Sequence, residues 1–299
     1  MEEILRQILP QWGMEDSKLS QVYSTAWEVN DSCIIKVYDD QEQLERNVKI
    51  LTILKDCNIP VAEILAAKTG EKYVTWEGRY FLVTRKLPGS NIVNLRDEAA
   101  VRKMGAAMAR LHQAFLRCEK EMEFWDNSLL GEMQGWIREN LEKNQWQIIG
   151  EEEYQKAVES LERMYDDLPK QLIHRDVHFG NFLFHEGNLS GYIDFDLSQR
   201  NIRIFDVCYF LAGLLAEETE EPLTKEEWLG NVQAVTCGYE SISLLTAGER
   251  AAIPCVMECI EILFAAYYVG MKDMICAREA AQILGLIQSC EKDLAGILS

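Results

Sequence analysis

The sequence contains no stretch of about 18 uninterrupted apolar residues, so we expect no membrane-spanning helix. Its first ten residues, MEEILRQILP, are acidic and lack a long apolar run, which argues against a secretory signal peptide. The nine cysteines include no Cys-x-x-Cys pair. Cys255 and Cys259 are one helical turn apart but have no further ligands nearby. We therefore expect no zinc site, reduced thiols and a cytoplasmic location.

Positive charge is scarce, since 30 Lys and Arg residues face 49 Asp and Glu residues and the net charge is −19. An acidic surface repels nucleic acids and anionic membranes, so we expect neither as a partner. It would suit a cationic partner, although solubility alone also explains it. The 299 residues, 48% of them hydrophobic, are enough for one large domain or two lobes with ample core. The oligomeric state is not indicated by the sequence.

Glycine-rich phosphate loops are also missing. No GxxxxGK[ST] motif occurs, and the segment 19–27 contains no glycine. A hairpin tip at Tyr23-Ser24-Thr25 could still offer backbone N–H groups and the Ser24 hydroxyl to phosphates.

The first third of the chain has the patterns of strands. The segments 26–29 and 33–38 flank Asn30-Asp31-Ser32, a hairpin turn, and a helical pattern follows over 40–56. Further strands are predicted at 64–68, 72–76 and 80–84, and a turn and hinge at 87–90. The remainder is mainly helical, so the predicted fold is α+β with two lobes. The predicted helices of this part are 97–116, 129–146, 151–167, 205–216, 225–239, 247–271 and 277–298.

The segment 172–197, LIHRDVHFGNFLFHEGNLSGYIDFDL, interrupts these helices with a strand–turn–strand pattern. Asp176 lies in His-Arg-Asp, Asn181 follows five residues later, and Asp194 lies thirteen residues beyond Asn181. A hairpin would bring these three side chains to one edge. One carboxylate can then orient a hydroxyl, while an amide and a second carboxylate hold magnesium, as phosphoryl transfer requires. A single loop aspartate could be a cap, but this ordered set favours function.

Lys36 lies in the apolar strand Ile34-Ile35-Lys36-Val37-Tyr38. A lysine there is costly unless its ammonium meets an anion, or unless it faces solvent at an edge. Together with the two acidic motifs it predicts a contact with the α- and β-phosphates. Asn47 stands where a similar helix often carries the glutamate that pairs with this lysine. Glu42 and Glu45 are therefore both candidate partners for Lys36, and Glu45 is preferred. The alternative is that both glutamates only solvate a helix face.

Three further polar residues are predicted to be structural. His174 is expected to pack under the loop, and Asp206 to accept backbone N–H groups of its own helix or of the catalytic loop. His112 lies on a helix with a strong core stripe and is expected to be a satisfied core or interlobe histidine rather than a ligand.

HRDVHFGN followed by IDFD, together with IIKVY, LHQAF and FDV, resembles the aminoglycoside phosphotransferase and choline kinase-like family. The resemblance implies a bilobal protein-kinase-like fold that phosphorylates a small-molecule hydroxyl with ATP and magnesium. By position it makes Asp176 the catalytic aspartate, Asn181 and Asp194 the metal ligands, and Lys36 the phosphate contact. Thr84-Arg85-Lys86 would be the adenine hinge, so Thr84 and Lys86 join Ser24 and Glu45 as nucleotide-binding candidates. The lobes would be 1–86, binding nucleotide, and 87–299, carrying the catalytic loop and acceptor site.

Two other functions remain open. A non-catalytic, spore-coat-type relative should have lost metal or catalytic residues, and none is lost here. A protein kinase would need a long activation segment, but only eleven residues separate Asp194 from Asp206 and no Ala-Pro-Glu follows.

The acceptor would be held by the C-terminal helices in this family. Glu258 and Glu261 lie on one helical face, which is either solvated or part of the acceptor cleft. If they line the cleft, the acceptor is cationic: an amino sugar, an aminoglycoside or a choline-like amine. Homoserine or a thiosugar remains an alternative. The candidate acceptor residues are Glu217, Glu218, Trp228, Glu258, Glu261, Tyr267 and Tyr268.

Overall fold

In the computed structural model, residues 1–91, 94–216 and 222–299 are described. The chain forms two compact units. Unit 1 comprises Met1–Asn91 and Phe182–Asp196, and unit 2 comprises Ile92–Asn181 and Leu197–Ser299. Two of the predicted acceptor residues, Glu217 and Glu218, lie outside the described residues.

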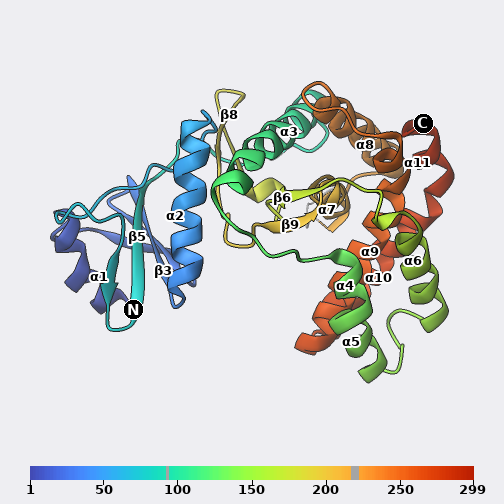
Figure 1. Cartoon of the computed structure of the whole chain (residues 1–299), viewed down its shortest axis with the longest axis horizontal. Coiled ribbons are helices and arrows are strands. Elements are labelled where there is room, and N and C mark those ends of the chain that lie inside the picture. The colour runs from blue at the N-terminus through green and yellow to red at the C-terminus, as the bar shows by residue number, and fades with distance from the viewer. Residues whose placement is uncertain (92–93, 217–221) are drawn as a thin grey trace. The chain divides into compact units, whose positions relative to one another are not determined.

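Unit 1 is built on a five-stranded antiparallel sheet in the order β1-β2-β3-β5-β4 (Figure 1). Cys33, Ile35 and Val37 of β3 are buried, whereas Lys36 lies on the opposite face, as the period of two predicts. In the register of β3 and β5, Lys36 is opposite Leu82. The strands are β1 (Leu19–Tyr23), β2 (Ala26–Val29), β3 (Cys33–Tyr38), β4 (Val74–Trp76) and β5 (Arg79–Arg85).

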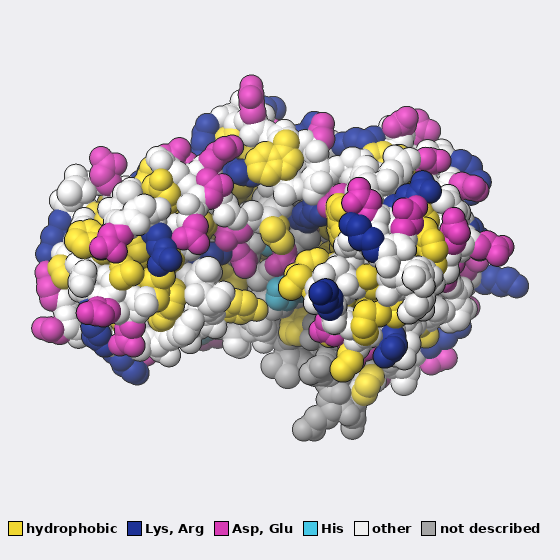
Figure 2. Space-filling model, turned by 90° about the horizontal axis from the view of Figure 1, so that it is seen from below, with side chains coloured by type: hydrophobic (Ala, Val, Ile, Leu, Met, Phe, Trp, Pro, Cys, Tyr) yellow, Lys and Arg dark blue, Asp and Glu magenta, His cyan; other side chains and the backbone are white. Residues whose placement is uncertain are grey.

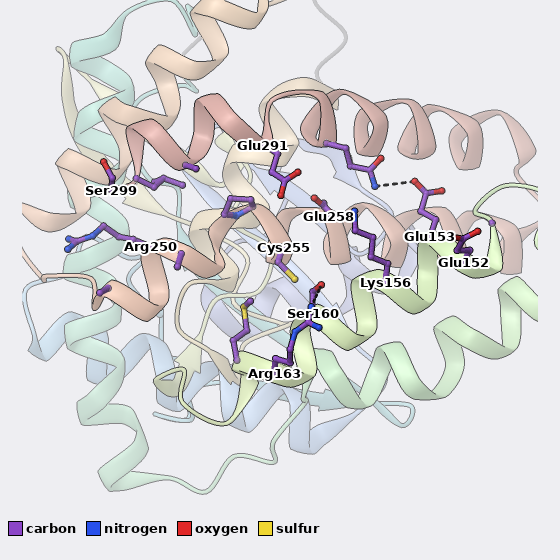
Figure 3. Close-up of a pocket in the computed structure, with 18 residues that line it drawn as sticks. Glu152, Glu153, Lys156, Ser160, Arg163, Arg250, Cys255, Glu258, Glu291 and Ser299 are labelled. Carbon is purple, nitrogen blue, oxygen red and sulfur yellow. Dashed lines mark hydrogen bonds between the residues drawn. The ribbon is translucent and has the colours of Figure 1, made fainter.

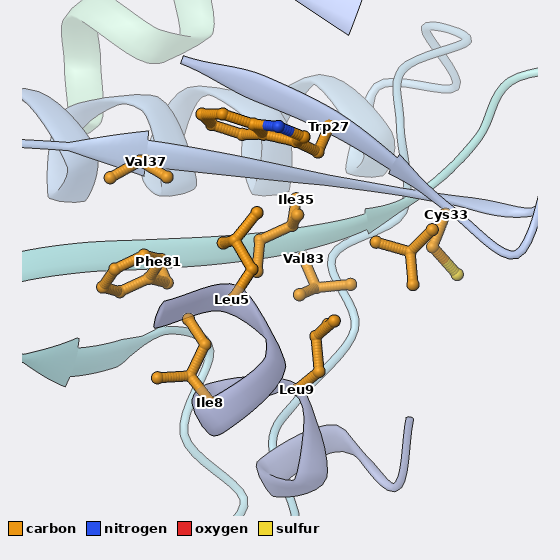
Figure 4. Close-up of a cluster of buried hydrophobic side chains, with 10 residues drawn as sticks. Leu5, Ile8, Leu9, Trp27, Cys33, Ile35, Val37, Phe81 and Val83 are labelled. Atoms are coloured by element: carbon orange, nitrogen blue, oxygen red, sulfur yellow. The ribbon is translucent and has the colours of Figure 1, made fainter. Parts of the chain in front are cut away.

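One hydrophobic cluster of unit 1 lies between this sheet and the N-terminal segment, α1 (Glu2–Ile8) with the 3₁₀ turn η1 (Leu9–Trp12). Figure 4 shows Leu5, Ile8 and Leu9 pointing from these turns toward the sheet. Burial of such side chains contributes about 1.5–3 kcal/mol each. The helix α2 (Gln41–Asp56) is capped by Asp40, whose side chain accepts a hydrogen bond from the backbone N–H of Glu42.

The strand predicted at 64–68 does not form. Only Ile64 makes an isolated bridge, to Thr84. The N–H of Ala67 donates to Glu71 and that of Lys68 to Gln11, so these two groups are drawn away from the sheet ladder. The strand predicted at 72–76 is shorter than expected, since it begins at Val74.

The hairpin of β7 (Phe182–His185) and β8 (Asn188–Tyr192) belongs to unit 1. Ser90 and Phe184 exchange two backbone hydrogen bonds of 3.0 and 2.8 Å, and the N–H of Tyr192 donates to the carbonyl of Pro60 at 2.9 Å. Gly89, with φ +104°, allows the close approach of the chain to Phe184.

The division into compact units therefore differs from the predicted one. The predicted boundary at Lys86 assigned the hairpin to the helical lobe. The cause is the set of backbone hydrogen bonds between the hairpin and the segment 60–90. The functional lobes remain a prediction.

Unit 2 is mainly helical, and α3 and α8 lie side by side in it (Figure 1). Asp97 caps α3, while Thr224 with Glu227 and Thr246 with Glu249 form capping boxes for α8 and α9. The helices are α3 (Glu98–Glu121), α4 (Leu129–Glu132), α5 (Arg138–Lys143), α6 (Glu151–Tyr165), α7 (Phe205–Ala216), α8 (Lys225–Glu240), α9 (Ala247–Met271), α10 (Met274–Ser289) and α11 (Glu291–Ile297).

Three parts of unit 2 differ from the prediction. The helix predicted at 129–146 is divided by a π-helical segment, η2 (Met133–Ile137), in which Gly135 has non-helical φ and ψ of −100° and −114°. The helix predicted at 277–298 divides at Cys290, whose φ and ψ of −98° and 2° leave the helical region. An additional strand, β9 (Gln199–Ile202), pairs antiparallel with β6 (Lys170–Ile173).

Among the described residues, α9 is long and apolar enough to cross a membrane by length and composition. However, 56% of its apolar window is buried inside the structure, and it packs on α10, α7 and α6. On the face shown in Figure 2, acidic and basic side chains are interspersed.

Candidate active site

The loop that carries Asp176 follows β6 and ends in the 3₁₀ turn η3 (Phe179–Asn181). Its backbone is held by Asp206, which is fully buried at the start of α7. The N–H groups of His174 and Arg175 each donate to a different oxygen of Asp206, both at 2.8 Å. Of the two predicted possibilities for Asp206, the structure therefore shows the second: it holds the catalytic loop.

Asp206 is in turn held by His112, whose Nε2 lies 2.9 Å from Asp206 Oδ2. The Nδ1 atom of His112 lies 2.8 Å from the Tyr239 hydroxyl, and only 2% of His112 is exposed. The predicted core role of His112 is thus confirmed. His174 is equally buried, as expected for a structural residue.

Asp176 receives a hydrogen bond on each carboxylate oxygen. The Tyr209 hydroxyl donates to Oδ1 at 2.8 Å, and the Asn181 amide donates to Oδ2 at 3.2 Å. Burial, followed by the charge of Asp176, raises the pKa of Tyr209 far above its ordinary value. Tyr209 therefore stays protonated and keeps Asp176 in one orientation. Tyr209 was not predicted from the sequence, although its place one helical turn after Asp206 could have indicated it.

Asn181 also donates from the same amide nitrogen to the backbone carbonyl of Asp176, at 2.8 Å. Because its amide nitrogen faces Asp176, its amide oxygen is the atom that it can offer to a metal ion. Two of the predicted site residues, Asp176 and Asn181, are therefore in contact within unit 2.

Lys36 and Asp194 form the other predicted pair, within unit 1. The Lys36 ammonium lies 2.8 Å from Asp194 Oδ1 and 2.5 Å from Asp196 Oδ2. Burial opposes the positive charge of Lys36, but Asp196 and Asp194 outweigh this effect, so the pKa of Lys36 is raised. Asp194 adopts φ +64°, an uncommon backbone conformation outside glycine.

The prediction that Glu45 pairs with Lys36 was wrong. Glu45 accepts hydrogen bonds from Tyr73 and Gln41 at 2.7 and 2.9 Å on the exposed side of α2. These bonds, Tyr73 first, lower the pKa of Glu45. Asn47, on the buried side of α2, instead donates to Asp196 Oδ1 at 2.6 Å. The reason lies in the helical period, which places position 47 toward the sheet and position 45 toward solvent.

The other nucleotide-binding candidates lie on the sheet of unit 1. Ser24 is exposed in the turn between β1 and β2, where the hairpin tip was predicted. Thr84 lies on β5 opposite Ile34. Lys86 follows β5 and its ammonium pairs with Glu28 at 2.7 Å. Their contact with a nucleotide stays a prediction.

The predicted acceptor residues divide into different environments. Trp228 is fully buried and donates to the backbone carbonyl of Leu211 at 2.9 Å, so it is a core residue. Glu261 is only 3% exposed, so it does not belong to a solvated face, and burial raises its pKa to about 8. Tyr268 follows Glu261 by two helical turns on α9, and its pKa is raised, chiefly by burial.

Aromatic rings connect this region to Tyr209. Ring centroids lie 5.6 Å apart for Tyr209 and Phe264, 6.3 Å for Phe264 and Tyr268, and 5.4 Å for Tyr268 and Tyr267. We call these four residues of α7 and α9 the aromatic row. It begins at the side chain that holds Asp176.

Glu258 lies elsewhere, in a hollow of about 1050 Å³ lined by α6, α9 and α11 (Figure 3). Burial raises the pKa of Glu258, opposed by nearby Lys156. Gln288 of α10 and Glu153 both line this hollow, and the Gln288 amide donates to Glu153 at 3.1 Å. Among the described residues, none of the predicted catalytic, metal or nucleotide ligands lines it. Glu258 and Glu261 therefore do not share one site.

Comparison with known proteins gives a consistent picture. Homoserine kinases of Gluconobacter oxydans and Polaromonas naphthalenivorans are 27% and 26% identical over 70% and 71% of this chain. The match spans less than two thirds of their length, 64% and 66%.

Solved structures share the fold at lower identity. An amicoumacin kinase in complex with AMP-PNP, Ca²⁺ and Ami has a TM-score of 0.72 at 16% identity, covering 98% of this chain and 93% of its own. A microcompartment-associated aminopropanol kinase has a TM-score of 0.68 at 17% identity, covering 97% and 98%. An aminoglycoside phosphotransferase, solved with GDP and kanamycin, has a TM-score of 0.69 at 15% identity, covering 97% and 99%.

These similarities confirm the predicted α+β, protein-kinase-like fold and the resemblance on which it rested. The model of the phosphotransferase enzyme family matches residues 17–234, which include Lys36, Asp176, Asn181 and Asp194. The chain belongs to the phosphotransferase enzyme family.

Proposed function

We propose that this protein is a small-molecule kinase that transfers the γ-phosphate of ATP to a hydroxyl group. The observation that carries the proposal is the state of Asp176, a carboxylate oriented by Tyr209 and Asn181 on a loop that Asp206 holds rigid. A carboxylate fixed in this way can accept the proton of an acceptor hydroxyl and align it for transfer. Membership of the phosphotransferase family supports the same reaction.

The remaining predicted residues would serve the nucleotide. Lys36 would contact its α- and β-phosphates, and Ser24, Thr84 and Lys86 remain candidates for further contacts. ATP is the proposed donor, and AMP-PNP in the amicoumacin kinase complex supports the use of a nucleotide.

Asn181 and Asp194 would hold magnesium. Their donors fit this ion, because a carboxylate and an amide oxygen are ligands that magnesium prefers. The left-handed backbone of Asp194 is a strained conformation of a kind found at functional sites. When bound, magnesium would neutralise charge on the phosphates.

A cationic acceptor is the class that the aromatic row and Glu261 favour. Aromatic faces attract ammonium groups, and a buried carboxyl can ionise to pair with one. Amino sugars, aminoglycosides and choline-like amines meet this description. Homoserine, which also carries an ammonium group, is the second candidate because the curated relatives are homoserine kinases.

The segment after Asp194 supports a small-molecule acceptor rather than a peptide. Residues Gln199–Ile202 form strand β9, paired with β6, so part of the short connection to Asp206 is committed to the fold. Little chain remains there for a peptide-docking activation segment.

The test is ADP release with ATP and magnesium against a panel of choline, kanamycin, homoserine and a thiosugar. Asp176→Asn keeps the side-chain shape and should lower kcat about a thousandfold. Asp167→Asn, the same change at an exposed carboxylate, should leave kcat unchanged. Full turnover by Asp176→Asn would contradict the role of Asp176, while nucleotide binding without turnover of any acceptor would favour a non-catalytic relative.

The acceptor class is tested with a matched pair. 3,3-Dimethylbutanol has the shape of choline without its charge. If the acceptor is cationic, kcat/KM for choline should exceed that for the neutral alcohol by about tenfold. Equal values for the two, with turnover present, would contradict a cationic site.

A further inference from the structure

Lys36 contacts two carboxylates that are held very differently. The Asp194 side chain is 47% exposed, whereas that of Asp196 is 18% exposed. Asp196 Oδ2 faces the Lys36 ammonium, and its Oδ1 accepts hydrogen bonds from Asn47 at 2.6 Å and from the Tyr38 hydroxyl at 3.2 Å. Both oxygens of Asp196 are therefore committed inside unit 1.

A phosphate-binding lysine needs a fixed anion beside it. In protein kinases, a glutamate from the helix after the lysine strand provides that anion. Here the residue of α2 that points toward this cluster is Asn47, which is neutral and cannot form an ion pair. Glu45 is turned toward Tyr73 and Gln41. The negative charge must therefore come from another element.

Among the residues that the structure describes, Asp194 and Asp196 are the carboxylates that pair with Lys36, and they differ in what else they can do. Under the proposed function, Asp194 gives its charge to a metal ion. Asp196 is already oriented by Asn47 and Tyr38, and these are neutral donors that leave its charge available for Lys36.

We propose that Asp196 is the positioning residue of Lys36, in place of a glutamate on α2, and that Asn47 connects α2 to it. The helix would then act on the lysine through a neutral hydrogen bond to Asp196. The inference rests on the proposed nucleotide-binding role of Lys36, and it adds a residue and a coupling to that role.

The first test is nucleotide affinity, measured by titration with ADP and magnesium. Asp196→Asn keeps the side-chain shape, but it removes the charge and replaces one accepting oxygen with an amide nitrogen that can only donate, so Kd should rise about tenfold. Adding Asn47→Glu to this variant supplies a carboxylate from α2 and should restore most of the affinity. Asp31→Asn is the matched control, because this aspartate of unit 1 is 74% exposed. It should bind ADP as the wild type does.

The second test needs no nucleotide. An amine-reactive ester labels unpaired lysines faster, and mass spectrometry measures the rate at Lys36. Asp196→Asn should increase this rate several-fold, and the double variant should return it toward the wild-type value. If the wild type bound no nucleotide, the proposed function would fail, yet the labelling rates would still decide the pairing.

Three results would overturn the inference. The first is an Asp196→Asn variant with wild-type affinity and wild-type labelling of Lys36. The second is a loss of affinity in Glu45→Gln together with none in Asp196→Asn, which would make Glu45 the anchor. The third is a loss in Asp196→Asn that Asn47→Glu does not restore, accompanied by a lower melting temperature, which would make Asp196 merely structural.

Discussion

Asp176 and Asp206 have identical side chains but different roles, because their surroundings differ. Asp206 is fully buried, and its oxygens accept two backbone N–H groups and face one imidazole, so it organises the loop. The Asp176 side chain is 22% exposed and accepts hydrogen bonds from the side chains of Tyr209 and Asn181. The buried aspartate is therefore scaffold, and the partly exposed one is available for chemistry.

Removing the Tyr209 hydroxyl should affect catalysis through Asp176. In Tyr209→Phe one oxygen of Asp176 loses its donor, and a hydrogen bond to a charged group contributes about 1.5–3 kcal/mol. We expect kcat to fall roughly tenfold, with ADP affinity unchanged. Steady-state kinetics and ADP titration measure the two quantities separately.

Tyr154→Phe is the matched control, because it removes a buried tyrosine hydroxyl of α6 that donates to the backbone carbonyl of Met133 at 2.6 Å. Its kcat should stay near the wild-type value. Equal loss in both variants would mean that the effect does not depend on the hydrogen bond to Asp176.

At the scale of elements, the contact of α3 and α8 supports the catalytic loop. His112 on α3 and Tyr239 on α8 are part of the hydrogen-bonded chain that ends at Asp206. The two helices approach so closely that a Cβ at Gly105 would collide with the Val235 carbonyl. A Cβ at Gly238 would collide with the Arg102 carbonyl. Small residues thus set the distance between the helices.

Gly105→Ala should therefore destabilise unit 2. The added methyl meets backbone atoms, which cannot rotate away, and overpacking of this kind costs about 1–3 kcal/mol. Denaturant unfolding followed by circular dichroism measures the loss.

Gly230→Ala is a matched control in α8, because its Cβ would meet only the Glu98 carboxylate at an ordinary 3.6 Å. There alanine should leave the free energy of unfolding unchanged or raise it by up to about 1 kcal/mol. Destabilisation of similar size in both variants would argue against a backbone collision at Gly105.

At the scale of the whole molecule, the pH dependence of stability should contain a contribution from Glu261. Its pKa is about 8 in the folded protein, against 4.5 for the free group, because burial disfavours its charge. Between these values the unfolded chain has lost this proton while the folded protein retains it. Stability due to this group is therefore present below about pH 4.5 and is lost as pH rises toward 8.

Glu261→Gln should remove this pH dependence. We expect the variant and the wild type to be similarly stable near the lower end of this range. As pH rises, the free energy of unfolding of the variant should exceed that of the wild type by a margin that grows by up to about 1.4 kcal/mol per pH unit. Thermal and urea unfolding at several pH values measure the difference.

Glu279→Gln changes an exposed glutamate of α10 and should track the wild type at every pH. A constant difference between Glu261→Gln and the wild type would show that Glu261 is ionised in the folded protein throughout this range.

The sequence by itself determined which residues are candidates for catalysis and metal binding, and in which order they follow one another. Asp176, Asn181 and Asp194 stand at spacings that a loop and one hairpin impose, and such local constraints can be recognised along the chain. Lys36 stood out because a charge within an apolar strand needs a partner. Helices and strands with a clear period, such as α3 and β3, were predicted for the same reason, since their burial pattern repeats in the sequence.

The tertiary structure decided the partners. Asn47 shares the buried face of α2 with Leu44 and Val48, so the period could have excluded Glu45, but not identified Asp196 as the anion. Tyr209, β9 and the assignment of the hairpin to unit 1 depend on hydrogen bonds between segments far apart in sequence. Glu261 is equally a matter of packing, because its burial comes from neighbouring elements. Spacing along the chain carries local geometry, whereas the contacts that orient and charge a side chain exist only after the chain has folded.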